Sequence, residues 1–162
     1  MSTAAKLGPT PEISTEIPAA RSRPDTTSAV TRGARRYLAQ SGYATVMELS
    51  LKGGRRADIM AIDAKGAVTI VEVKSSIEDF RTDGKWFDYG PYCDHFYFAV
   101  SPAFPAELIP DHCGLIIADA YEAVIEREPE PTPLNAARRK AVLLRFVQAA
   151  AGKLWRLEDP QI

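Results

Sequence analysis

The chain has 162 residues, of which 46% are hydrophobic and 25% charged, with a formal net charge of -1 at pH 7. These values fit one globular domain with a single core and exclude the bulk charge of a nucleic-acid or membrane binder. Two cysteines are too few for a disulfide-stapled scaffold, and no apolar run reaches the roughly 20 residues of a membrane span, so we expect a soluble, cytoplasmic protein with no membrane partner.

Residues 1–24 are rich in Pro, Ser, Thr and Ala without periodicity, which predicts a disordered tail before a single domain over residues 25–158. A helix follows, with N-cap side chains at residues 25–27 and a suitable end at Gly42. The apolar residues of this segment recur at helical spacing and predict its core-facing side: Val30, Ala34, Tyr37 and Leu38.

Alternation and turn residues predict six strands, over residues 44–50, 56–62, 67–74, 95–100, 114–119 and 123–127. The third strand is apolar on both faces for most of its length, which is typical of a covered central strand. The polar and aromatic segment 75–92 is predicted to be partly helical. A closing helix runs from an Asn135 cap to about Ala151, with these inner positions: Ala137, Ala141, Leu144 and Phe146 or Val147. The order predicts an α/β fold with a central mixed sheet flanked by helices.

Three charged residues interrupt the strand-like segments. Glu72 and Lys74 are two apart on the third strand and point to the same side, and the short hairpin can set Asp58 beside Glu72. Two adjacent carboxylates raise a pKa or attract a cation such as Mg²⁺, and a nearby lysine can orient water or offset phosphate charge. The alternative is a buried ion-pair network without catalysis.

Basic residues gather in one window of the sequence and predict either a basic face for phosphates or an ordinary solvated helix face. Arg55 and Arg56 flank the strand that carries Asp58, which favours phosphate contacts. The other basic residues of the window are Arg32, Arg35, Arg36 and Lys52.

Asp58 and the later Glu72-Val73-Lys74 resemble the D…ExK core of the PD-(D/E)XK nuclease superfamily. The segment from about Arg32 to Arg127 resembles the MmcB-type DNA-repair proteins. The resemblance is carried by the sequence motifs GRRADIMAID, IVEVKSS, EDFR, KWFDY and YCDHFYFAV. This resemblance implies a restriction-endonuclease-like core, DNA as partner and a Mg²⁺-dependent nuclease activity in DNA repair, with Mn²⁺ as a substitute.

The resemblance also implies roles for individual residues. Asp58 and Glu72 become metal ligands together with the Val73 carbonyl, and Lys74 becomes the catalytic lysine. Many members take a further acid from the first helix, which lacks an internal one here, so Glu48 is either the substitute ligand or a solvated strand residue.

Further residues support this site or are ordinary surface residues. Lys85 and Tyr89 are four apart, which on a helix gives them one face, where they contact DNA, orient Lys74 or simply pack. The predicted DNA-binding set is therefore Arg32, Lys52, Arg55, Arg56 and Lys85. Asp79 and Asp83 either extend the acidic site or are solvated loop acids, which is the usual state of such residues.

Three functions remain open from the sequence. The first is a metal-dependent DNA nuclease that acts in repair. The second is a catalytically weak or inactive DNA-binding repair factor on a nuclease fold, working with a partner protein. The third is a protein-interaction scaffold whose charges form a structural network.

Overall fold

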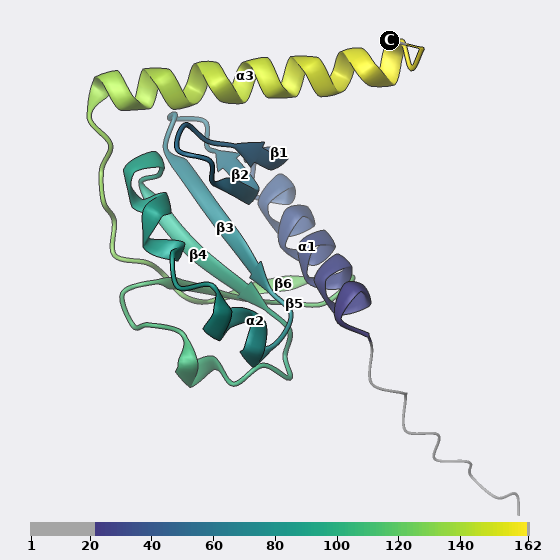
Figure 1. Cartoon of the computed structure of the whole chain (residues 1–162), viewed down its shortest axis with the longest axis vertical. Helices are drawn as coiled ribbons and strands as arrows, with labels where there is room; N and C mark the ends of the chain where they lie inside the picture. Colours follow the sequence, from purple (N-terminus) through teal and green to yellow (C-terminus); the bar gives the residue numbers. More distant parts are fainter. Residues whose placement is uncertain (1–21, 162) are drawn as a thin grey trace, which may run out of the picture.

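Six strands lie in sequential order in one mixed sheet, with helices on both faces and a long helix across one end (Figure 1). The computed structural model describes residues 22–161. The helices are α1 (Arg23–Gln40), α2 (Ile77–Thr82) and α3 (Ala136–Glu158), with 3₁₀ turns η1 (Trp86–Tyr92) and η2 (Ala106–Leu108). The strands are β1 (Ala44–Ser50), β2 (Arg56–Ile62), β3 (Val68–Lys74), β4 (His95–Val100), β5 (Gly114–Ala118) and β6 (Ala123–Arg127).

The centre of the sheet is β3, and every one of its seven residues is buried. It pairs antiparallel with β2 and parallel with β4, β4 pairs parallel with β5, and the outer pairs are antiparallel. The predicted α/β fold with a mixed sheet is confirmed, and the strand bounds agree with the prediction to within one residue. The strand bounds were predictable because turn residues mark several of the strand ends, as at residues 51–55, 63–67 and 119–122.

Helix α1 covers one face of the sheet. Val30, Ala34 and Leu38 are buried against core residues of that face, as predicted, and Tyr37 is half-buried. Gly33 is buried where α1 meets the β5–β6 turn, and a Cβ there would lie 2.1 Å from a backbone carbonyl oxygen. Only glycine therefore lets α1 approach the sheet this closely.

The start of α1 corrects the predicted tail boundary. Ser22 is the N-cap, its side chain accepting the Asp25 N–H, and the helix begins at Arg23 with Pro24 in its first turn. Proline is well suited there because that N–H has no partner within the helix. The rest of the predicted tail, residues 1–21, lies outside the described residues.

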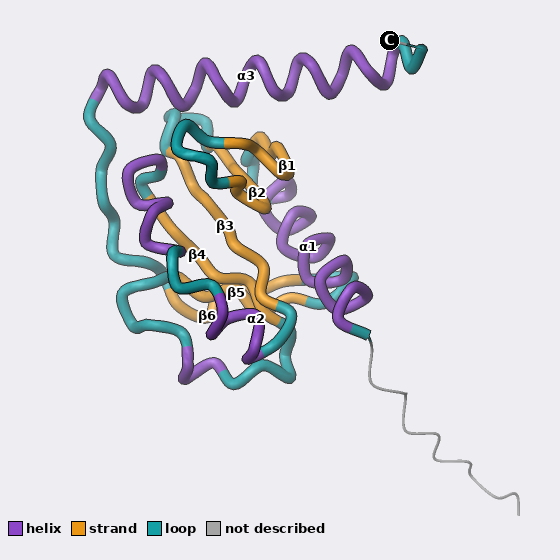
Figure 2. Tube along the Cα trace, in the orientation of Figure 1, coloured by secondary structure: helices purple, strands orange, loops and turns teal. Residues whose placement is uncertain are grey.

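The opposite face of the sheet is covered by α2 and η1, and α3 lies across its end, where Val142 and Phe146 join the core of this face (Figure 2). The segment predicted to be partly helical contains the short α2 and the 3₁₀ turn η1, which holds Pro91. Tyr89 and Cys93 pack with Met60 and Ile70 in the core of this face.

Helix α3 differs from its prediction in length and in orientation. It extends to Glu158 rather than about Ala151, and it buries Val142 and Phe146. Of the predicted alternatives Phe146 and Val147, Phe146 faces inward, but the three other predicted inner positions are exposed: Ala137, Ala141 and Leu144. The prediction failed because α3 carries apolar residues on two faces, and periodicity cannot tell which one meets the sheet. No helix within residues 22–161 is long and apolar enough to cross a membrane.

Asp94 ties the start of β3 to the start of α3. Its carboxylate accepts hydrogen bonds from the Val68 N–H at 2.7 Å and the Leu134 N–H at 2.9 Å. It also accepts hydrogen bonds from both terminal nitrogens of the Arg139 guanidinium, at 2.6 and 2.7 Å. Burial raises the pKa of this carboxyl, but the Arg139 and backbone hydrogen bonds outweigh burial and lower the pKa to about 2. Asp94 is therefore a buried, fully engaged carboxylate.

Replacing Asp94 with asparagine is expected to lower the free energy of unfolding at pH 7 by about 3 kcal/mol, because the amide turns a donor toward N–H groups. The depressed pKa means that the wild-type advantage is present above the unfolded-state value of about 3.9 and disappears as pH falls toward 2. Urea unfolding from pH 7 to pH 3 measures it. Glu126→Gln, at an exposed acid on β6, is the control. The prediction would be contradicted if Asp94→Asn lowered the free energy of unfolding by the same amount at pH 3 as at pH 7.

Candidate active site

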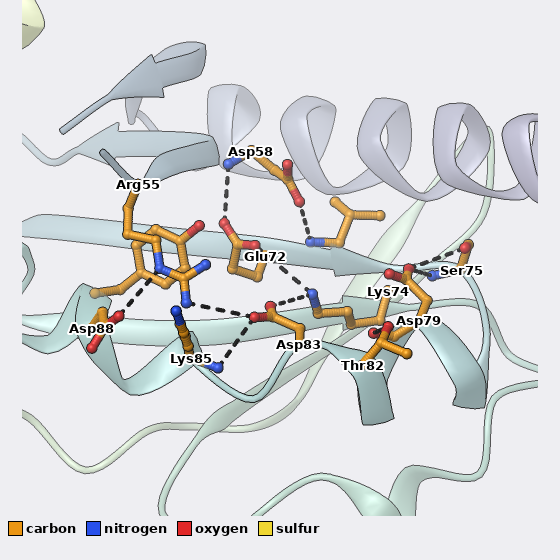
Figure 3. A network of polar contacts seen from close by, with 12 residues as sticks. Arg55, Asp58, Glu72, Lys74, Ser75, Asp79, Thr82, Asp83, Lys85 and Asp88 are labelled. Atoms are coloured by element: carbon orange, nitrogen blue, oxygen red, sulfur yellow. Dashed lines mark hydrogen bonds and ion pairs between the residues drawn. The ribbon is translucent and has the colours of Figure 1, made fainter. Parts of the chain in front are cut away.

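Asp58 and Glu72 lie side by side where the β2–β3 ladder ends (Figure 3). Glu72 Oε1 accepts the Asp58 N–H at 3.2 Å, and Asp58 Oδ2 accepts the Val73 N–H at 2.8 Å. The predicted adjacency of the two carboxylates is confirmed. Each carboxylate uses one oxygen to hold the backbone and has a second oxygen for another partner.

An irregularity in β1 accompanies this arrangement. Glu48 has a backbone φ of +52°, a left-handed conformation that residues other than glycine rarely adopt. Glu48 also does not pair with Asp58 in the β1–β2 ladder. As a result, Val46 and Leu49, three residues apart, pack in the same core cluster although strict alternation would separate them. The break in alternation coincides with the point where Asp58 reaches across to β3.

Lys74 extends beside the carboxylates and is held by Asp83. Its Nζ lies 2.6 Å from Asp83 Oδ2 and 4.0 Å from Glu72 Oε2. Lys74 and Glu72 are each only 5% exposed, so their charges are largely removed from water. Buried charges need such partners. The interpretation of Asp83 as a solvated loop acid is wrong.

The pKa values of the acidic groups follow from these contacts. Burial, then the charge of Asp58, raises the pKa of Glu72 to about 7. Burial also raises the pKa of Asp58, against the opposing hydrogen bond from Val73. Burial raises the pKa of Asp83 too, but the Lys74 ammonium outweighs it and lowers the value. The paired carboxylates therefore favour either a proton or a cation.

A cavity of about 500 Å³ opens onto this set. Asp58, Glu72 and Lys74 line it from the sheet, and residues of α1 and α2 complete it. Asp79 Oδ2 accepts the N–H and hydroxyl of Ser75 at 2.9 and 3.1 Å, so this acid caps the start of α2 while also lining the cavity.

A second cavity, of about 660 Å³, lies between α1 and β1 and shares Thr27 and Asp58 with the first. Its walls include three exposed arginines: Arg32, Arg35 and Arg36. Arg35 is steadied by hydrogen bonds to Thr45 Oγ1 and Met47 Sδ. We call this cavity the basic groove. Its arginines line a cavity that adjoins the carboxylate site, because Asp58 belongs to both.

Glu48 lies in the basic groove rather than beside Glu72. Its side chain is mostly exposed and 3.9 Å from Arg56. Within the part of the chain that the structure describes, no three His, Cys, Asp or Glu side chains are grouped to hold a metal ion. The carboxylates of Asp58 and Glu72 lie side by side at the site, and Val73 lines the same cavity. This set fits Mg²⁺, which is usually held by one or two carboxylates and keeps several waters.

The other predicted DNA-binding residues have different surroundings. Arg55 lies inside the polar network, 3.7 Å from Asp83 and 3.4 Å from Asp88 (Figure 3). Arg56 is exposed near the site. Lys52 lines a separate cavity with Arg138 and Arg145 of α3, a cavity that shares no lining residue with the carboxylate site.

Lys85 and Tyr89 do not share a helical face as predicted, because their segment is a 3₁₀ turn with three residues per turn. Lys85 precedes this turn and is exposed. Tyr89 is buried, and its hydroxyl donates to the Arg56 carbonyl at 2.9 Å. Burial and the nearby Glu72 charge raise the pKa of Tyr89. The guanidinium of Arg55 lies 5.5 Å from the centre of the Tyr89 ring.

The fold and site define an α/β protein in which one buried carboxylate, one half-buried carboxylate and a buried lysine gather at the end of a central strand, next to a basic groove. Residues 15–161 match the family model described as DNA repair protein MmcB-like, and the chain belongs to this family. A solved structure, the SPO1766 protein of unknown function from Silicibacter pomeroyi, is 40% identical, with a TM-score of 0.81 over 84% of this chain and 93% of that chain. No curated protein matches the sequence.

Replacing Glu72 with glutamine is expected to change how stability depends on pH. The raised pKa means that the folded protein keeps a proton that the unfolded chain releases, so wild-type stability falls as pH rises through about 7. Glutamine cannot ionise. The difference in Tm, variant minus wild type, should therefore increase between about pH 5 and pH 8.

Thermal unfolding in EDTA, followed across this pH range, measures the difference. Glu107→Gln, at an exposed acid on η2, is the control and should give a flat difference. A flat or decreasing difference for Glu72→Gln would show that the pKa of Glu72 is not raised in the folded protein.

Proposed function

We propose that the protein is a metal-dependent DNA nuclease of the PD-(D/E)XK superfamily that acts in DNA repair, with Mg²⁺ as its metal and Mn²⁺ as a substitute. The observation that carries the proposal is the convergence of Asp58, Glu72 and Lys74 on one cavity beside the basic groove. The repair role is supported by the family.

In this proposal, the Asp58 and Glu72 carboxylates and the Val73 carbonyl hold the metal. A bound Mg²⁺ supplies Lewis acidity at the phosphate. Lys74 presents its ammonium to the attacking water or to a phosphate oxygen. Since Lys74 is only 2.6 Å from Asp83, that carboxylate both offsets the buried charge and fixes the direction of the side chain.

The basic groove holds the DNA backbone. Arg32 and Arg36 are exposed on α1, and the groove reaches Asp58 at its end. Guanidinium groups bind phosphate oxygens in a planar, bidentate manner. A DNA strand that lies along α1 would thus bring a phosphodiester to the carboxylates of Asp58 and Glu72.

The Lys74→Ala and Asp58→Ala variants are expected to lose cleavage by about 10²-fold or more while still binding DNA, because they remove the chemistry but none of the arginines of the basic groove. The assay uses labelled single-stranded, duplex, flap and branched DNAs with Mg²⁺, Mn²⁺ or EDTA. Lys65→Ala, at an exposed turn lysine, is the matched control and should cleave normally. Cleavage that persists in EDTA, or equally in Lys74→Ala, would contradict the proposal.

A second candidate is a DNA-binding repair factor that does not cleave. It is favoured by the Lys74–Asp83 ion pair, which satisfies the lysine within the protein, and by the exposed position of Glu48. Binding by the wild type without cleavage of any DNA in the panel would select this function.

Arg32→Ala and Arg36→Ala are each expected to weaken DNA binding and to reduce the slope of log K against log salt by about 0.9, the value for one lost phosphate contact on duplex DNA. Fluorescence anisotropy across a salt series measures the slope. Arg156→Ala, at an exposed arginine on the last turns of α3, should leave it unchanged. If all three variants gave the same slope of log K against log salt, the DNA would not bind in the basic groove.

A further inference from the structure

The outer face of α3 carries large apolar side chains that nothing within the described chain covers. Because successive helical residues are rotated by about 100°, these side chains lie on the side away from the buried Val142 and Phe146. They are more than half exposed: Leu144, Val147, Leu154 and Trp155, at 54%, 61%, 55% and 53%. A patch of this kind on one helix marks an interaction surface.

The spacing of the patch is that of a helix–helix seam. Leu144, Val147, Ala151 and Leu154 follow one another at intervals of three, four and three residues. Apolar residues at this 3.5-residue period pack against another helix in the manner of a coiled coil. Lys140 and Glu158 continue the same spacing by one step at each end, so the seam begins with a positive charge and ends with a negative one.

The end of α3 is free to take part. All residues from Lys153 to Glu158 are exposed, and this part of α3 extends past β1 (Figure 1). Leu157 is 80% exposed even though it follows the buried side of the helix, because the sheet does not reach that far. A second helix can therefore lie along the whole seam.

We propose that α3 is a homodimer interface, in which α3 of a second copy packs antiparallel on the seam. The charges at the ends of the seam, Lys140 and Glu158, favour a second copy of α3 in the antiparallel direction. In the antiparallel pair centred between Val147 and Ala151, Lys140 of each copy faces Glu158 of the second copy. A parallel pair would instead set lysine against lysine and glutamate against glutamate, which disfavours it.

The side-chain sizes are self-complementary in the same register. Val147 faces Ala151 of the second copy, and Leu144 faces Leu154. Beside the seam, the large Trp155 faces the small Ala141. Alternation of large and small residues lets two helices approach closely and interdigitate. Each contact occurs twice about a two-fold axis, as in the commonest class of homodimer.

The first test is the oligomeric state of the full chain, measured by sedimentation velocity up to about 100 µM. The wild type is expected to be a dimer, and Val147→Glu should weaken dimerisation by at least about 100-fold because it buries a charge at the centre of the seam. Val124→Glu is the matched control, since Val124 is 55% exposed on β6. Circular dichroism verifies that both variants are folded.

The second test addresses the register. Lys140→Glu and Glu158→Lys should each weaken dimerisation by about 10-fold, and the variant carrying both changes should recover to within a few-fold of wild type. A monomeric wild type would overturn the proposal, even if it captured a helix of a different protein. A dimer insensitive to Val147→Glu, or a double variant weaker than both single ones, would overturn it as well.

Discussion

The site depends on an exchange of hydrogen bonds between carboxylates and backbone at the end of the β2–β3 hairpin. Where the ladder stops at the Ile59–Val71 pair, the Glu72 carboxylate takes the Asp58 N–H and the Asp58 carboxylate takes the Val73 N–H. The two acids thus replace strand pairing with side-chain bonds. They are held by the sheet itself, which is the kind of rigid support a reactive site needs.

This arrangement is costly without a further partner. Glu72 and Lys74 are largely withdrawn from water, Asp58 is half-buried, and Asp83 supplies one more negative charge close to Lys74. Burial, then the charge of Asp58, raises the pKa of Glu72, and burial raises the pKa of Asp58, while Lys74 opposes both shifts. Shifted pKa values cluster at functional sites, so these two acids support the proposal of a cation-binding site.

Local pattern predicted the strands and the central position of β3, and the short hairpin was enough to bring Asp58 to Glu72. Other features depend on packing that sequence spacing does not encode. Asp83 follows Lys74 by nine residues through a turn, so nothing in the pattern linked them. The left-handed Glu48 and the 3₁₀ geometry of η1 are likewise set by neighbours, and they decided where Glu48 and Lys85 lie.

Strand β3 also connects the site to α3. Its first residue is bound by Asp94, which holds Arg139 at the start of α3, and its last residues carry the site. The two ends of one buried strand cannot move independently, because interiors are close-packed. Pairing through α3 would consequently fix two sites in a defined relation about a two-fold axis. Duplex DNA has the same local symmetry, since its strands run antiparallel, and dimeric DNA-binding proteins exploit that match.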